Sequence, residues 1–151
     1  MRANLDNTPR ISMALNVWDR ADMITKRPIL ILIAEDDPDQ SAMLSELLQL
    51  EGFRTQVVTR GDDALKRLLE NHLDIAILDC RMPGMSGEKV LEAYRKTAKR
   101  PIPVILVSSF ASPADLHRFK QDGAIACLSK PFSYEELRST LSAVLTSEIG
   151  I

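Results

Sequence analysis

Several acidic side chains directly follow short apolar segments of this sequence. Glu35 and Asp36 come after the apolar run 29–34, and Asp79 comes after the run 75–78. Two carboxylates about 5 Å apart, at an effective dielectric constant near 20, repel each other by roughly 3 kcal/mol. A group of three therefore needs a nearby cation or raised pKa values. Mg²⁺ binds one or two carboxylates and keeps other positions for water and phosphate, so these acids predict a magnesium site if the fold brings them together.

A hydroxyl and a lysine follow two further apolar runs. Ser108 comes after residues 104–107, and Lys130 closely follows residues 125–128. An ammonium group can pair with carboxylate or phosphoryl oxygens, and a hydroxyl can donate a hydrogen bond to the same oxygens. With a carboxylate nucleophile and Mg²⁺, this set suits phosphoryl transfer to an aspartate. Pro131 also allows a cis peptide bond after Lys130.

Strand-like runs alternate with helix-period segments from residue 28 onward. The predicted strands are 29–34, 55–58, 75–78, 104–107 and 125–128. An apolar stripe of helical spacing follows each of them except 104–107, which is followed by a short polar helix. The runs 29–34 and 104–107 lack polar alternation, which is typical of strands covered on both faces. Right-handed crossovers then place the carboxyl ends of all strands at one edge. We expect an α/β, flavodoxin-like (βα)5 three-layer sandwich with a parallel five-stranded sheet of order 2-1-3-4-5, in which the first and third strands are neighbours.

Composition narrows the class of protein. The chain has 151 residues, 45% of them hydrophobic, which suits one globular domain. A formal charge of -2 supplies no strong basic field for nucleic acid or an anionic membrane surface. The longest apolar run, 29–34, is far shorter than the roughly 20 residues that span a bilayer. Two cysteines are too few for a disulfide framework. We therefore expect a soluble, cytoplasmic protein.

The first 27 residues differ in kind from the rest. Thr8 and Pro9 form a helix-start pair, and Ile11, Leu15 and Trp18 follow at helical spacing. One interpretation is a short amphipathic helix that serves as a lid or dimer contact, and the other is a frayed extension. We expect residues 1–27 to be an N-terminal extension, residues 28–146 the domain, and residues 147–151 a C-terminal tail.

Four motifs follow the predicted strand ends in order. They are ILIAEDDP (31–38), LDCRMPGMSG (78–87), VSS (107–109) and SKPF (129–132). Together they resemble the receiver domain of two-component response regulators, over about residues 28–146. The resemblance implies that Asp79 accepts a phosphoryl group from a histidine kinase or a histidine phosphotransfer protein. It further implies that Mg²⁺, for which Mn²⁺ is an expected substitute, is held by Asp79, by Asp36 directly, by Glu35 through water and by the main-chain carbonyl of Arg81.

The resemblance also implies roles for residues around the phosphoacceptor. Ser108 matches the switch hydroxyl and Lys130 the lysine that pairs with the phosphoryl group. Such a domain catalyses its own phosphorylation and a slow hydrolysis, and it is otherwise not an enzyme. Cys127 stands where receivers often carry a switching Tyr or Phe, which puts an aromatic readout in doubt. Arg81 and Phe110 match two variable positions that tune the lifetime of the phosphoryl group.

The expected partners are a phosphoryl donor and a downstream protein target in a phosphorelay. We expect no direct nucleic acid and no membrane contact, and the sequence is compatible with a homodimer. Two alternatives stay open: a constitutive interaction module of receiver fold, and the receiver fragment of a longer DNA-binding response regulator. A haloacid-dehalogenase-like phosphatase is disfavoured because Arg81 stands where its second aspartate is expected. A nucleotide site is disfavoured because no glycine-rich loop follows the first strand.

Overall fold

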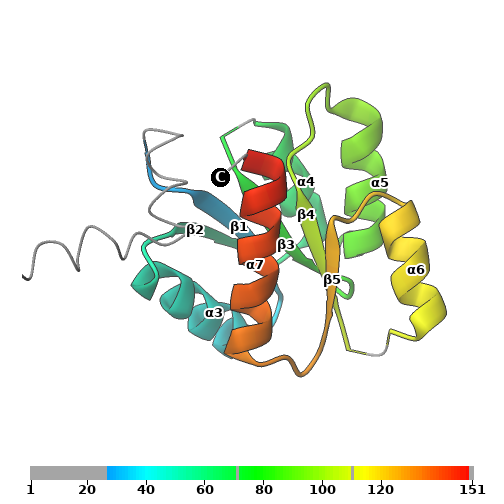
Figure 1. Ribbon diagram of the computed structural model, residues 1–151. Helices are drawn as coiled ribbons and strands as arrows, with labels where there is room; N and C mark the ends of the chain where they lie inside the picture. The colour runs from blue at the N-terminus through cyan, green and yellow to red at the C-terminus, as the bar shows by residue number, and fades with distance from the viewer. Residues whose placement is uncertain (1–26, 71, 110, 150–151) are drawn as a thin grey trace, which may run out of the picture.

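The structure, a computed structural model, describes residues 27–70, 72–109 and 111–149, and in these residues five strands alternate with five helices (Figure 1). The strands are β1 (Leu30–Ala34), β2 (Arg54–Val58), β3 (Ile75–Asp79), β4 (Val104–Ser108) and β5 (Ala126–Ser129). The helices are α3 (Pro38–Leu50), α4 (Gly61–Leu69), α5 (Gly87–Thr97), α6 (Pro113–Gln121) and α7 (Tyr134–Ile149). This is the alternation that the sequence predicts.

The five strands form one parallel sheet of order β2-β1-β3-β4-β5, which confirms the predicted topology. The register pairs Ala34 of β1 with Leu78 of β3, and Asp79 with Val107 of β4. Neighbouring strands therefore end at nearly the same level. The residues that follow β1 and β3 come out of the sheet side by side.

The sheet is covered by helices on both faces, which gives three layers (Figure 1). Alternate strand residues such as Ile31 and Ile33 pack in one core cluster with residues of α3 and α7. Their neighbours Leu30 and Leu32 pack in a second cluster with residues of α4, α5 and α6. Because both faces of β1 are buried, its sequence has no polar alternation.

Helix α3 starts immediately after the acidic residues that follow β1. Asp37 is its N-cap, and the side chain accepts hydrogen bonds from the main-chain N–H groups of Asp39 and Gln40. Pro38 occupies the first turn, where its missing N–H and its restricted φ are tolerated. The first turn of α3 is thereby held at the edge of the sheet where the acids lie.

Each strand differs from its predicted range by one residue at one end or, for β5, at both ends, and two further boundaries differ or lie outside the described residues. Helix α7 continues to Ile149, so residues 147–149 belong to that helix and not to a tail. Strand β5 begins at Ala126, one residue later than predicted. The N-terminal helix expected from Thr8 to Trp18 lies outside the described residues. Among the helices that the structure describes, none combines the length and apolar character needed to cross a membrane.

Candidate functional site

Three carboxylates meet at the carboxyl ends of β1 and β3. One oxygen each of Glu35, Asp36 and Asp79 lies within 4.8 Å of the others. Glu35 and Asp79 are only 7% and 6% exposed, whereas Asp36 faces solvent. They converge because β1 and β3 are adjacent parallel strands, so the structure brings together the acids that the sequence singled out.

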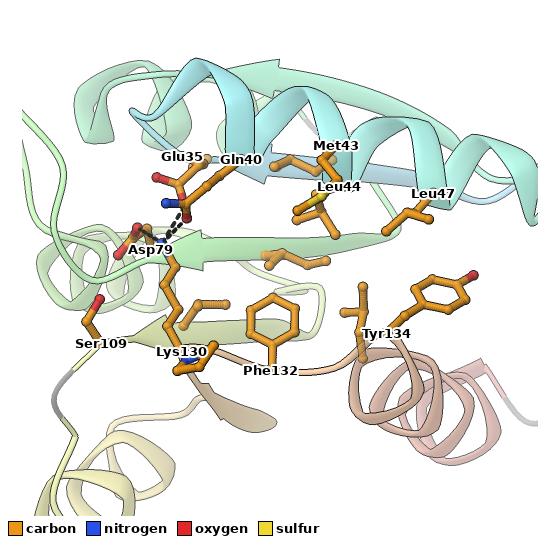
Figure 2. A pocket seen from close by; sticks show the side chains of 16 residues that line it. Glu35, Gln40, Met43, Leu44, Leu47, Asp79, Ser109, Lys130, Phe132 and Tyr134 are labelled. Atoms are coloured by element: carbon orange, nitrogen blue, oxygen red, sulfur yellow. Dashed lines mark hydrogen bonds and ion pairs between the residues drawn. The ribbon is translucent and has the colours of Figure 1, made fainter.

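Lys130 reaches into this cluster from the loop after β5. Its Nζ lies 2.7 Å from Asp79 Oδ2, 2.5 Å from Glu35 Oε1 and 2.9 Å from Gln40 Oε1 (Figure 2). Its main-chain N–H donates to the Ser108 carbonyl at 2.8 Å, and the bond to Pro131 is cis. The ammonium group therefore bridges both buried acids.

Each buried carboxylate also accepts a main-chain hydrogen bond. The N–H of Arg81 donates to Asp79 Oδ1 at 3.0 Å, and the N–H of Asp37 donates to Glu35 Oε2 at 3.2 Å. Asp79 and Glu35 thus each have one oxygen on Lys130 and the other on the backbone. This arrangement limits how the two side chains can rotate.

Charge at the site is unevenly balanced. Burial raises the pKa of Glu35, and the negative charge of Asp79 adds to the rise, although the Lys130 ammonium and the Asp37 N–H act against it. Burial by itself lowers the pKa of Lys130, but hydrogen bonds to Asp79 and Glu35 outweigh it and leave the pKa above its ordinary value. The shift of Glu35 is thus mainly an effect of burial, whereas the shift of Lys130 reflects its two carboxylate partners.

The donor set suits a hard divalent cation. Lys130 pairs with Glu35 and Asp79, and Asp36 adds a third carboxylate, so the ionised cluster has two negative charges in excess; all candidate ligands are oxygens. Carboxylate ligands with room for water are what Mg²⁺ prefers. Glu35, Asp36 and Asp79 therefore fit the ion that the sequence analysis expects.

Two serine hydroxyl groups lie near the site, one at the end of β4 and one on the wall of the cavity. Ser108 ends β4, is half-buried and pairs with Ser129 in the sheet register. Ser109, which sequence reasoning did not single out, lines the same cavity as Asp79 and Lys130 (Figure 2). Phe110, the predicted tuning residue, lies outside the described residues.

Gln40 is a second residue that sequence reasoning did not single out. It contacts Lys130 from the first turn of α3. Gln40 lies four residues after Asp36, in the first helical turn of the segment that follows the first strand. This spacing is the signal that could have identified it.

The two cysteines are packing residues. Both are free thiols, Cys80 buried and Cys127 half-buried in β5. Both belong to the core on the face of α4, α5 and α6. Burial raises the pKa of Cys80 to about 12 and also raises the pKa of Cys127.

An apolar groove leads away from the acid cluster. Its volume is about 740 Å³, and it lies between α3 and the segment that joins β5 to α7 (Figure 2). The apolar side chains labelled along it are Met43, Leu44, Leu47, Phe132 and Tyr134. At its far end the Tyr134 hydroxyl donates to Glu51 at 2.6 Å. The site is thus a small polar cluster that adjoins a larger apolar surface.

Comparison with known proteins gives consistent matches. The family model described as "Response regulator receiver domain" matches residues 31–142. The chain is 36% identical over 115 residues to "Transcriptional regulatory protein CpxR" of Escherichia coli (strain K12), covering 76% of this chain and 48% of that protein. It is 32% identical to "Sensor histidine kinase RcsC" of the same organism, covering 76% of this chain and 12% of that protein.

A solved structure agrees with these sequence matches. The "DNA-binding response regulator, LuxR family, from Staphylococcus aureus" is 33% identical with a TM-score of 0.70. The match covers 78% of this chain and 98% of that one. The chain therefore spans half or less of the two curated relatives but nearly all of this solved chain.

Proposed function

The chain belongs to the response regulator receiver family, and we propose that Asp79 is its phosphoacceptor. The observation that carries the proposal is the placement of Asp79 at the end of β3, where its two oxygens contact the Lys130 ammonium and the Arg81 N–H. It is one of two buried acids of the cluster, and it lies on the same cavity as Lys130. A nucleophile held in this way needs little reorganisation before it reacts.

The proposed reaction is phosphoryl transfer from a phosphohistidine. A carboxylate oxygen of Asp79 forms the new P–O bond while the P–N bond of the donor breaks, and the electron pair of that bond stays on the imidazole nitrogen. Lys130, 2.7 Å from Asp79, is placed to neutralise charge on the phosphoryl oxygens. The domain itself supplies this positioning, so we propose that it catalyses its own phosphorylation and slow dephosphorylation without acting on any other substrate.

The proposed cofactor is Mg²⁺, with Mn²⁺ as a substitute. Asp36 and Asp79 would hold it directly, Glu35 through water, and the main-chain carbonyl of Arg81 would complete the protein ligands. When bound, the ion supplies charge neutralisation for the transferring group. The excess negative charge of the cluster supports this proposal.

The proposed switch uses residues around the phosphoacceptor. Ser108 and Lys130 would contact the phosphoryl group, while the side chains of Arg81 and Phe110 would tune its lifetime. Cys127 is half-buried in β5 and packs against the core, so its small side chain offers little area for a readout of the aromatic kind. We infer that α6 or the loop that follows it transmits the signal instead.

The proposed donor is a histidine kinase or a histidine phosphotransfer protein. To deliver its phosphoryl group to Asp79, the donor must cover the mouth of the site, and the apolar groove beside it is the natural contact surface. We further propose a protein as the downstream target and the cytoplasm as the location, which the two free thiols support.

The test is the mass of the intact protein after incubation with acetyl phosphate and Mg²⁺. We expect a gain of one phosphoryl group, and we expect no gain with Asp79→Asn or with EDTA. Equal labelling of Asp79→Asn would exclude Asp79 as the acceptor. Absence of labelling in the unmodified chain, under conditions that label another receiver, would favour the constitutive interaction module.

A further inference from the structure

The Lys130 ammonium group has three N–H bonds, and each has an acceptor. The acceptors are Asp79 Oδ2, Glu35 Oε1 and Gln40 Oε1, all within 2.9 Å of Nζ. An ammonium group has no further donor to offer. A phosphoryl group on Asp79 takes over the N–H bond that the Asp79 carboxylate held. It can receive a second hydrogen bond from Lys130 only if Glu35 or Gln40 is released.

Gln40 is the acceptor that is easiest to displace. Phosphorylation turns the Asp79 carboxylate into an uncharged acyl group, so the acceptors to compare are Glu35 and Gln40. Hydrogen bonds between two charged partners are stronger than those with one neutral partner, and of these two Gln40 carries no charge. Its side chain is exposed, whereas Glu35 and Asp79 are buried. Release of Gln40 therefore exposes its amide oxygen to water at small cost, while release of Glu35 would leave a buried carboxylate without its cation.

The backbone of Gln40 does not need to move in this exchange. Its N–H is bound by the Asp37 side chain at 3.1 Å in the N-cap of α3. Its side-chain Nε2 also donates weakly to Asp37 Oδ2, at 3.4 Å. Only the side-chain rotamer has to change for Lys130 to lose this contact.

We propose that Gln40 is a positioning residue that holds Lys130 in the unphosphorylated state and gives way when a phosphoryl group takes its place. The inference rests on the proposed function, because it concerns the same lysine. It gives a role to a residue that lies outside the four sequence motifs and for which the sequence predicted none. It also predicts that changes at Gln40 act on phosphorylation through Lys130 and not through the fold.

Two substitutions at Gln40 have opposite expected effects. Gln40→Leu keeps the approximate size but removes the competing acceptor, so we expect the apparent Kd for beryllium fluoride with Mg²⁺, a phosphoryl analogue, to fall about three- to ten-fold. Gln40→Glu supplies a charged acceptor, so we expect the same Kd to rise by at least as much. Gln49→Leu is the matched control, because Gln49 lies on the same helix and bonds Ser45 and Thr55 away from the site.

A second readout needs neither phosphorylation nor metal. Nitrogen-15 NMR detects lysine ammonium groups that are protected from exchange, and in EDTA we expect a protected Lys130 signal that weakens in Gln40→Leu but not in Gln49→Leu. An unchanged signal in Gln40→Leu, or Kd changes in the same direction for both Gln40 variants, would overturn the inference. If the signal behaves as expected but the unmodified chain binds no beryllium fluoride, the proposed function fails, and the proposed exchange fails with it.

Discussion

The residues of the site are arranged for reactivity at some cost in stability. Two buried acids share a single lysine and a third, exposed acid lies close to them, so the cluster carries repulsion that the fold must hold in place. Active sites commonly contain such unfavourable charge, and its relief by substitution stabilises the fold. The stability of the protein should therefore respond to both Mg²⁺ and the number of carboxylates.

Asp36→Asn removes one negative charge without touching the contacts of Lys130. In EDTA we expect the free energy of unfolding to rise by about 1 kcal/mol, a modest gain because water screens the exposed Asp36. We also expect Mg²⁺ to stabilise this variant less than the unmodified chain. Urea unfolding with EDTA or Mg²⁺ measures both effects. Asp39→Asn, exposed on the first turn of α3, should give no gain, and an equal gain there would contradict a specific repulsion at the cluster.

Lys130→Ala removes the only ammonium group found between the two buried acids in the described structure. In EDTA we expect the free energy of unfolding to fall by about 3 kcal/mol, because Glu35 and Asp79 lose their shared cation. Mg²⁺ should still bind and should recover part of the loss. Phosphorylation should no longer change the conformation, which NMR spectra with and without beryllium fluoride can detect. A conformational change equal to that of the unmodified chain would remove the proposed role of Lys130.

At the scale of elements, the site depends on where strands end and helices begin. The alternation was predictable from the apolar runs, and crossover handedness places all strand ends at one edge of the sheet. The strand order, and with it the convergence of Asp36 with Asp79, was predictable only by taking the flavodoxin-like order for this alternation. The contacts of Gln40 and Ser109 were not predictable in the same way. Which side chain of a first helical turn meets the site depends on the angle at which α3 leaves the sheet, and sequence periodicity does not give that angle.

Gly87→Ala tests the close approach of α5 to the end of β3, where Asp79 lies. A Cβ at this position would lie 2.3 Å from the Asp79 carbonyl oxygen, so the start of α5 or the end of β3 must shift. We expect a loss of about 2 kcal/mol in urea unfolding, together with slower labelling by acetyl phosphate. Gly52→Ala is the control. Because Gly52 has a φ of +100°, we expect this substitution to lower the free energy of unfolding by about 1 kcal/mol. A Cβ at this position meets open space, so labelling should be unchanged. Equal labelling rates in the two variants would contradict the argument.

The two thiols, Cys127 on β5 and Cys80 in the loop after β3, should react at different rates. Because the pKa of Cys80 is raised to about 12, its reactive thiolate is scarce at pH 8. We expect iodoacetamide to modify the half-buried Cys127 before the buried Cys80, and both cysteines rapidly in urea. Peptide mass spectrometry identifies the modified residue. Faster modification of Cys80 in the folded protein would contradict its burial.

At the scale of the whole molecule, two helical layers leave one edge of the sheet open for a partner. The groove beside Asp79 is apolar, and Met43 on its rim is 61% exposed. Composition alone indicated only that nucleic acid and membranes were disfavoured. The groove itself could not be predicted, because it depends on how the segment between β5 and α7 lies against α3.

Met43→Ala separates docking of a protein donor from the chemistry at Asp79. Loss of an apolar anchor should slow transfer from a phosphorylated histidine phosphotransfer protein about five-fold or more, while labelling by acetyl phosphate stays unchanged. Leu50→Ala is the control, since Leu50 is 85% exposed on the same helix but does not line the groove. Equal slowing by both variants, or slowing with acetyl phosphate, would contradict docking in the groove.

The central claim is that Asp79 carries the phosphoryl group, and the most direct measurement locates the modified residue. The protein is labelled with acetyl phosphate and Mg²⁺, the acyl phosphate is reduced with borohydride, and the peptides are analysed by mass spectrometry. We expect homoserine at position 79 and unmodified acids at Glu35 and Asp36. Reduction at either of those acids, or a labelled protein without reduction at position 79, would contradict the claim.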